Sequence, residues 1–233
     1  MKAQYIPPPE RVQHLAQIEK LTLIGDSELL NSAYLALFCS VRCPASIILK
    51  TYDLAQQLKD KGIGVISGFH SPVEQEALVT LLRGTAPVIV SPARSITSMR
   101  VPSDWKPHIE RGQMLIVSPF PESQNRATQQ TATLRNQLVA ALAQRVFIAY
   151  AEPGGKTEIF ARELISAAQN VTTFDAKETE NLLTAGAKPL SCTDPLELDT
   201  GLNEVSYVQE GDDRCEPDGS SQASSRAGWC WNC

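Results

Sequence analysis

Two strand-to-helix turns contain the residues of this 233-residue chain whose types and spacing suit the binding of an anion. The first turn is Ser67-Gly68, which follows a short β-branched run. The second is Gly154-Gly155-Lys156-Thr157, which follows the apolar run 146–151. A helical pattern begins directly after each turn, and the unpaired N–H groups and dipole of a helix N-terminus attract negative charge. We therefore expect the two turns to form one phosphate-binding crevice.

The glycines of these turns favour close contact between a ligand and the backbone. Gly68, Gly154 and Gly155 lack a Cβ atom, so a phosphate oxygen can approach their N–H groups, and they tolerate the positive φ angles that such loops need. Lys156 adds a positive charge, and the threonine after it adds a hydroxyl donor. The alternative interpretation is two ordinary turns in which this threonine, or Ser71 in the first turn, caps a helix.

A third candidate lies in the helical pattern 129–143, where Arg135 is followed by Asn136. The apolar positions of this helix place Arg135 near the edge of the core-facing side, from which a guanidinium can fork onto a phosphate. The alternatives are a solvated arginine or a salt bridge to an acidic neighbour. Asn136 has the chemistry to bond either a ligand or the backbone of a turn.

The sequence indicates little catalytic chemistry. Glu74 and Glu158 have the chemistry of a general acid/base pair for N-glycosidic cleavage, but a carboxylate in a first helical turn also interacts favourably with the helix dipole. The three histidines show no metal-binding spacing. We therefore expect no enzymatic activity, no catalytic residue and no cofactor.

Four of the six cysteines form two closely spaced pairs, Cys39 with Cys43 and Cys230 with Cys233. Together they offer the four thiolates of a structural zinc site. However, nothing in the sequence brings the two pairs together, and a buried Cys39 can act as a small hydrophobic residue. We predict no metal site.

Strand and helix patterns alternate between residues 21 and 174. The expected strands are 21–25, 63–67, 87–90, 114–117, 146–150 and 171–174, and the expected helices are 46–61, 73–82, 129–143 and 158–168. Strands separated by helices in this way pair in parallel through right-handed crossovers. The sequence thus predicts an α/β fold with a Rossmann-like, doubly wound, mostly parallel sheet, which binds ligands outside the carboxyl ends of its strands.

The charge of the chain is unevenly distributed. Residues 192–233 hold nine Asp or Glu and two Arg, a balance of −7, whereas residues 1–191 hold 19 Lys or Arg and 17 Asp or Glu, a balance of +2. Because the acidic segment is also rich in Ser and Gly, we expect a single domain over 21–190, an N-terminal extension over 1–20 and a disordered acidic tail over 191–233. No apolar stretch is long enough to span a bilayer, and we expect a cytoplasmic protein.

Several short motifs between residues 20 and 175 resemble a known family when taken in order. They are Ser67-Gly68, Gly84-Thr85, the segment 115–121 (LIVSPFP), Leu134-Arg135-Asn136 and Gly154-Gly155-Lys156-Thr157. In order and spacing this set resembles the DNA processing protein A family. The resemblance implies an extended Rossmann fold that binds single-stranded DNA, takes part in DNA uptake and recombination, forms a homodimer and has the RecA recombinase as a partner.

The resemblance also implies which residues contact DNA. It assigns the phosphate-binding site to Gly25, Ser67, Gly68, Arg135, Asn136, Gly154, Gly155, Lys156 and Thr157. Gly25-Asp26-Ser27 stands where the family usually has Gly-x-Arg, so the site is expected to lack one cation.

Two further hypotheses follow from single features. Pro153-Gly154-Gly155 is also similar to part of the Pro-Gly-Gly-x-Gly-Thr loop of the cytokinin-activating phosphoribohydrolases, although Lys156 and Thr157 leave no third glycine. A nucleotide sensor or a phosphoribohydrolase is therefore the alternative function. The acidic tail, in turn, is expected to compete with DNA for the cationic crevice, an effect that salt should reduce.

Overall fold

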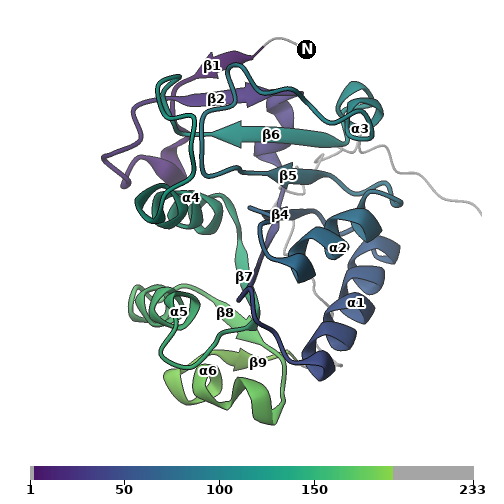
Figure 1. Ribbon diagram of the computed structural model, residues 1–233, viewed down its shortest axis with the longest axis vertical. Coiled ribbons are helices and arrows are strands. Elements are labelled where there is room, and N and C mark those ends of the chain that lie inside the picture. The colour runs from purple at the N-terminus through teal and green to yellow at the C-terminus, as the bar shows by residue number, and fades with distance from the viewer. Residues whose placement is uncertain (1–2, 191–233) are drawn as a thin grey trace, which may run out of the picture. The chain divides into compact units, whose positions relative to one another are not determined.

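The computed structural model describes residues 3–190, which form one nine-stranded sheet with helices on both faces (Figure 1). The strand order is β1-β2-β6-β5-β4-β3-β7-β8-β9. The strands are β1 Gln4–Ile6, β2 Leu21–Ile24, β3 Leu35–Cys39, β4 Val65–Ser67, β5 Val88–Val90, β6 Met114–Ser118, β7 Arg145–Tyr150, β8 Val171–Thr173 and β9 Lys188–Pro189. In the part of the chain that is described, no helix is long and apolar enough to cross a membrane.

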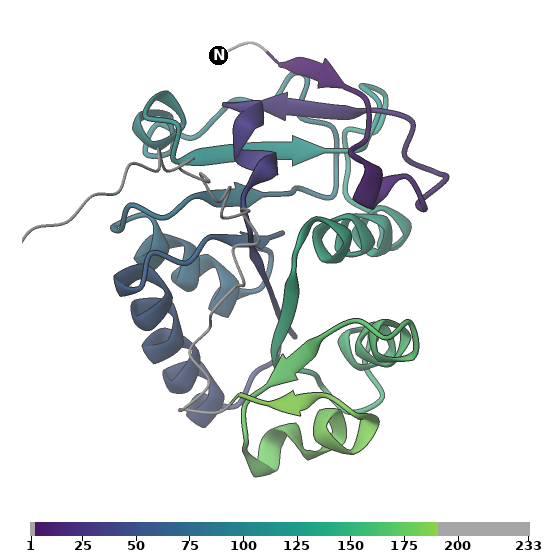
Figure 2. The ribbon, with the colours of Figure 1, turned by 180° about the vertical axis from the view of Figure 1, so that it is seen from behind.

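Six α-helices and three short 3₁₀ helices connect the described strands. The α-helices are α1 Ala45–Asp60, α2 Pro72–Leu81, α3 Lys106–Glu110, α4 Gln129–Leu142, α5 Lys156–Ser166 and α6 Glu180–Ala185. The 3₁₀ helices are η1 Glu10–Val12, η2 Ser27–Asn31 and η3 Lys177–Thr179. Figure 2, seen from behind, shows α1 and α2 on one side of the sheet and α4, α5 and α6 on the other.

Strand β3 shows how the sequence builds the two layers of the core. All five of its residues are buried, and alternate side chains point to opposite faces of the sheet. Ala36 and Phe38 join the core under α4 and α5, while Leu35, Leu37 and Cys39 join the core under α1 and α2. Burial on both faces explains why this strand is a continuous apolar run rather than an alternating one.

The order of the strands creates a topological switch point at the centre of the sheet. Strand β3 pairs in parallel with β4 on one side and with β7 on the other. From β3 the chain proceeds to β4, β5 and β6 in one direction, and after α4 it returns to β7 and continues to β8 and β9 in the other. The loop after β3 therefore leads to α1 and the loop after β7 leads to α5, on opposite faces of the sheet. Such sheets bind ligands at the carboxyl ends of these two strands.

The predicted Rossmann-like, mostly parallel sheet is confirmed, with two corrections. The central strand β3 was not predicted, because the run 35–39 stands close behind the first expected strand without a helix between them. Strand β2 is also not the first parallel strand, since it pairs antiparallel with both β1 and β6. The acidic tail predicted over 191–233 lies outside the described residues.

Candidate phosphate-binding crevice

The carboxyl ends of β3 and β7 carry two loops that are tied together by hydrogen bonds. The loop 40–44 leads from β3 to α1, and the loop 151–155 leads from β7 to α5. The N–H of Ser40 donates to the carbonyl of Tyr150 at 2.9 Å, and the N–H of Glu152 donates to the hydroxyl of Ser40 at 3.0 Å. Arg42 and Glu152 form an exposed ion pair at 4.0 Å. The two loops thus lie in contact with each other at the switch point.

The glycine turn at the start of α5 has free backbone N–H donors. Gly154 has a φ of +71°, and Gly155 folds so tightly that an added Cβ would lie 2.8 Å from the carbonyl oxygen of Glu152. Among the described residues the N–H groups at 156, 157 and 158 have no hydrogen-bond partner, as expected for the first turn of a helix. Lys156 is exposed beside them. The turn therefore combines free backbone donors with an exposed cation.

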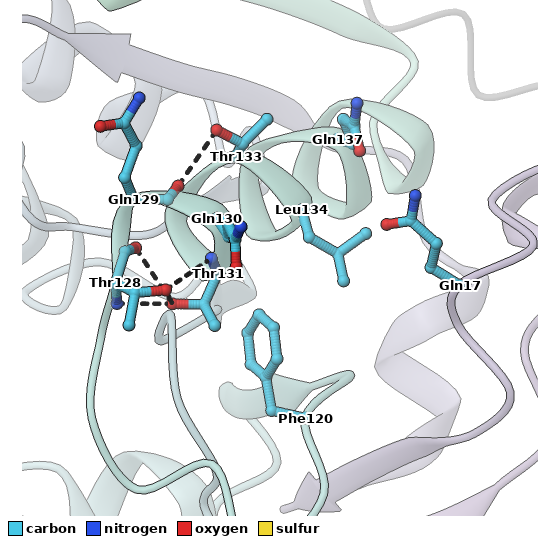
Figure 3. A pocket seen from close by; sticks show the side chains of 9 residues that line it. All are labelled: Gln17, Phe120, Thr128, Gln129, Gln130, Thr131, Thr133, Leu134 and Gln137. Carbon is cyan, nitrogen blue, oxygen red and sulfur yellow. Dashed lines mark hydrogen bonds between the residues drawn. The ribbon is translucent and has the colours of Figure 1, made fainter.

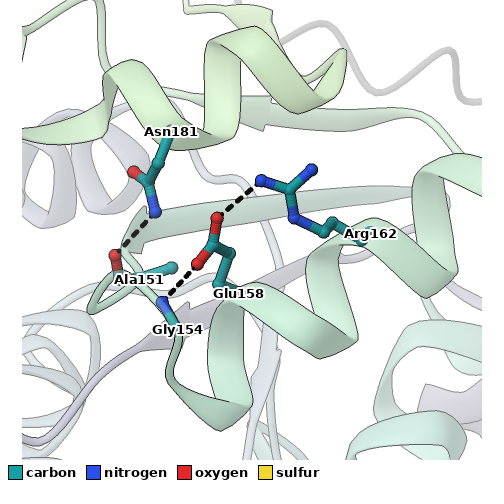
Figure 4. Close-up of polar contacts among 5 residues, drawn as sticks. All are labelled: Ala151, Gly154, Glu158, Arg162 and Asn181. Carbon is teal, nitrogen blue, oxygen red and sulfur yellow. Dashed lines mark hydrogen bonds and ion pairs between the residues drawn. The ribbon is translucent and has the colours of Figure 1, made fainter.

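One donor of the same turn is already occupied by a side chain of the protein (Figure 4). The carboxylate of Glu158 accepts a hydrogen bond from the N–H of Gly154 at 2.6 Å and one from Arg162 at 2.7 Å. The Arg162 contact, followed by the Gly154 bond, holds the pKa of Glu158 below its usual value. These contacts identify Glu158 as part of the turn itself and explain its place without an acid/base role.

Gly68 lies against the guanidinium of Arg135. A Cβ atom at position 68 would lie 1.2 Å from Nη1 of Arg135, so the space that the sequence analysis reserved for a phosphate holds this side chain. Ser67 is fully buried, and its hydroxyl accepts a hydrogen bond from the N–H of Phe69 at 3.1 Å. Phe69 adopts a φ of +45°, which is uncommon for a bulky residue and marks a strained turn.

The carboxylate of Glu74 is buried at the start of α2 beside this turn. It accepts hydrogen bonds from the N–H groups of Cys39 at 2.8 Å, His70 at 2.7 Å and Ser71 at 3.2 Å. The hydroxyl of Ser71 accepts in return from the N–H of Glu74, which makes a capping box. Burial raises the pKa of Glu74 despite these bonds and the nearby charge of Arg135. Glu74 therefore connects the ends of β3 and β4.

Arg135 is a buried cation beside the Gly68 turn. Its Nε donates to the side chain of Asn136 at 2.8 Å and its Nη1 donates to the carbonyl of Ser91 at 3.1 Å. Burial lowers the pKa of Arg135, and the charge of Glu74 opposes that effect. The structure thus places the guanidinium of Arg135, with Asn136 bonded to it, behind Gly68.

Gly25 does not lie near the other predicted site residues. It follows β2, which runs antiparallel to β6, so it lies by the amino end of β6 rather than at the carboxyl ends of the parallel strands. An added Cβ at this position would approach the carbonyl oxygen of Met114, the first residue of β6, to 2.8 Å. The predicted position of Gly25 assumed that β2 is the first parallel strand, whereas β2 is antiparallel to both of its neighbours.

Arg42 is the functional candidate that the sequence analysis missed. It lies in the loop that follows β3, a strand that was not predicted, and its side chain is 87% exposed at the switch point. The apolar run 35–39, followed by a short polar segment that contains Arg42, is the pattern that could have indicated this strand and its loop. The crevice therefore has exposed cations on both of its loops, Arg42 and Lys156.

A groove of about 960 Å³ runs along α4 on the side facing the N-terminal segment (Figure 3). Its walls are uncharged and mostly amide and hydroxyl side chains, with Gln17 lying across from Leu134 and Gln137. Phe120 and Thr131 line it nearer the start of the helix. The groove is therefore suited to hydrogen bonding with a neutral polar ligand, and it has no charge for holding a free anion.

Within residues 3–190, no cluster of three or more His, Cys, Asp or Glu side chains that could hold a metal ion is found. Cys39 is the last residue of β3 and Cys43 lies just before α1, while Cys230 and Cys233 are outside the described part of the chain.

Comparison with known proteins relates this chain to a family. The family profile of DNA recombination-mediator protein A matches residues 7–197. DNA processing protein A from Helicobacter pylori, solved in a study of its single-stranded DNA binding mode, is 23% identical; the match covers 81% of this chain and 93% of that one, with a TM-score of 0.67. DNA processing protein A from Streptococcus pneumoniae is 16% identical over 82% of this chain and 71% of that one, with a TM-score of 0.66. No curated protein matches the chain.

Proposed function

Because the chain belongs to the DNA recombination-mediator protein A family, we propose that it is a recombination mediator that binds the phosphate backbone of single-stranded DNA at the switch point between β3 and β7. The observation that carries this proposal is the meeting of two loops there. One presents Arg42, and the other presents Lys156 with the free N–H groups of the first turn of α5. Cations and a helix N-terminus together favour a polyanion.

The proposed roles of the site residues follow from whether each one is exposed or buried. Arg42 and Lys156 are exposed and contact phosphates directly, with Gly155 and Thr157 supplying backbone or hydroxyl donors. Arg135 is buried and donates hydrogen bonds to Asn136 and to the carbonyl of Ser91. It therefore positions the Gly68 turn and contributes a positive charge from beneath the surface. Phosphate contacts of this kind bind DNA without reading its sequence.

The experiment that tests the proposal is fluorescence anisotropy with labelled single-stranded oligonucleotides of increasing length. We expect affinity to rise with length and to fall with salt. Arg42→Ala or Lys156→Ala should each reduce the log–log salt slope by about 0.7, the value for one lost phosphate contact on a single strand. Arg83→Ala and Lys61→Ala are matched controls, because both residues are exposed and precede the amino ends of β5 and β4, at the opposite edge.

Nucleoside monophosphates serve as competitors in the same assay. Saturation by one nucleotide, no gain with oligonucleotide length and release of free base would contradict the proposal and favour the nucleotide sensor or phosphoribohydrolase. The crevice contacts argue against base release, because both candidate carboxylates already hold backbone N–H groups.

Three further features are proposed from the family alone. The chain forms a homodimer, contacts the RecA recombinase when loading it onto DNA, and works in the cytoplasm. Sedimentation equilibrium of the full chain measures the first, and a strand-exchange assay with RecA on coated single strands measures the second. Fractionation of cells that express the chain addresses the third.

A further inference from the structure

We propose that Glu74 is a positioning residue of the DNA site, because its carboxylate fixes the loop that presents Arg42. This role rests on the proposed function, since Arg42 is one of the two exposed cations assigned there to phosphate contacts. Glu74 itself is only 5% exposed, so it does not reach a phosphate. It acts through the backbone that it holds.

The end of β3 extends past the neighbouring strand β4. The parallel pairing of the two strands ends at Ala36, opposite Ile66. Cys39, the last residue of β3, lies beyond this pairing, and its N–H donates to the carboxylate of Glu74 at 2.8 Å. A buried backbone N–H needs an acceptor. The carboxylate of Glu74 therefore takes the place of a strand carbonyl at this point.

Strand β7 fixes the other side of β3. The register between these two strands shifts directly after Phe38. The N–H of Ser40 then donates to the carbonyl of the last residue of β7 at 2.9 Å. An irregularity of this kind redirects the chain where a strand ends. The direction in which the chain leaves β3 toward Arg42 thus depends on Glu74 on one side and on β7 on the other.

The carboxylate of Glu74 joins the end of β3 to the start of α2. One of its oxygens accepts from Cys39, and the other accepts from the N–H groups of His70 at 2.7 Å and Ser71 at 3.2 Å. Three such bonds favour the ionised form of a carboxyl group. An ionised carboxylate accepts on both oxygens, whereas an amide has only one acceptor. The connection therefore requires an acid of this length at position 74.

The loop that presents Arg42 is short and is held at both ends. Arg42 lies between Cys39, which Glu74 holds, and Pro44, the N-cap residue of α1. A loop that is fixed in this way does not have to be ordered when a ligand binds. Without the bond to Glu74, the ordering of the loop becomes part of DNA binding. We expect this cost to weaken binding by about two- to tenfold.

Hydrogen exchange of the full chain without DNA, resolved at the Cys39 amide, tests the bond itself. Glu74→Gln should increase the exchange rate of this amide at least about tenfold. The amide oxygen of the variant is expected to keep the two bonds at the start of α2, so its NH2 group faces the N–H of Cys39. Glu74→Asp keeps the charge but is one methylene shorter, and it should have the same effect.

Ser71→Ala is the matched control for both variants. It removes the hydroxyl that accepts from the N–H of Glu74 and leaves the bond between Glu74 and Cys39 in place. The protection of the Cys39 amide should therefore persist in this control, although the helix cap is lost. Unchanged exchange of this amide in both Glu74 variants would overturn the proposal.

A double-mutant cycle on DNA affinity tests whether Glu74 acts through Arg42. Fluorescence anisotropy is measured with single-stranded oligonucleotides, well below the unfolding midpoint of each variant. Glu74→Asp should weaken binding by about two- to tenfold in the wild-type and Lys156→Ala backgrounds, and by less than about twofold when Arg42→Ala is already present. A purely structural role would give the same loss in all three backgrounds, and that result would overturn the proposal.

The two measurements distinguish a failure of this proposal from a failure of the proposed function. If the wild-type chain gains no affinity with oligonucleotide length, the proposed function is wrong, whatever the exchange rates are. If the wild-type chain binds as expected and both Glu74 variants bind equally well, only the positioning role is wrong. Glu74→Asp decides the matter if Glu74→Gln does not fold.

Discussion

The guanidinium of Arg135 fills the space beside Gly68 that a side chain at position 68 would need, with Nη1 only 1.2 Å from the site of a Cβ atom. Gly68 is therefore required by packing within the crevice wall. Gly68→Ala should move the guanidinium away from the carbonyl of Ser91 and from the charge of Glu74. Because a buried polar group then loses its partner, we expect urea unfolding to show a loss of about 1–3 kcal/mol in the free energy of unfolding.

A double-mutant cycle separates this cause from a general effect of alanine in the turn. If the clash with Arg135 is responsible, Gly68→Ala should cost less stability when Arg135→Ala is already present. Equal costs in the two backgrounds would mean that the guanidinium does not determine the need for glycine.

Gly25→Ala tests the correction that the structure makes to the site. Gly25 has a φ of +123°, and an added Cβ would approach the Met114 carbonyl to 2.8 Å, so the variant should be destabilised by at least about 1–2 kcal/mol. The residue lies at the opposite edge of the sheet from Lys156. DNA affinity measured on the folded variant, well below its unfolding midpoint, should therefore equal that of the wild-type chain. A drop comparable to that of Lys156→Ala would place Gly25 in the site after all.

The difference between the predicted and the actual position of Gly25 has a specific cause. Apolar periodicity was sufficient to predict the layers of the fold, because most strands are buried on both faces. It could not show that β2 turns back on β6, since direction depends on pairing rather than on local composition. This single error moved the first loop of the crevice from Arg42 to Gly25.

The sequence alone also could not show which charged residues are buried. Arg135 and Glu74 each stand on a helix that looks amphipathic, and either could have faced solvent. Their burial depends on contacts between residues far apart in the chain, such as Nη1 of Arg135 with Ser91 and Glu74 with the N–H of Cys39. The exposed position of Lys156, by contrast, follows from its place in the first turn of α5.

Glu152→Gln tests the electrostatics of the crevice mouth. Glu152 pairs with Arg42 at 4.0 Å, and both side chains are at least half exposed, so the pair contributes little to stability. Removing the negative charge frees Arg42 for a phosphate. We expect DNA affinity to increase about two- to fivefold at low salt, with no change at high salt because screening removes the effect. The control is Glu163→Gln, an exposed carboxylate further along α5, which should leave affinity unchanged.

Removal of residues 192–233 tests the expected competition by the acidic segment. This deletion raises the net charge of the chain from −5 to +2, because the segment carries a balance of −7. Affinity for single-stranded DNA should rise at low salt, and the gain should vanish as salt increases. Unchanged affinity at low salt would dismiss the competition. A variant with the nine acidic residues of the segment changed to their amides controls for the loss of chain length.

The pH dependence of stability should reveal the contacts of Glu158. In the folded protein the pKa of this carboxylate is lowered by Arg162 and by the Gly154 N–H. The unfolded chain, with a glutamate pKa of about 4.3, therefore takes up the proton first as the pH falls. The stability from these contacts is complete above about pH 4.3 and is lost as the pH falls through the lowered pKa of the folded state.

Glu158→Gln removes this titration. The variant should be less stable than wild type by about 1 kcal/mol at pH 7, measured by urea unfolding, because a neutral amide bonds Arg162 more weakly. The difference should shrink as the pH falls below about 4.3, where the wild-type carboxylate also becomes neutral. Glu163→Gln on the same helix should show no such convergence. The difference in free energy of unfolding between wild type and Glu158→Gln could instead stay constant down to acid pH. That result would mean that the bond between Gly154 and Glu158 does not depend on the charge, and that the α5 turn holds its shape by backbone geometry alone.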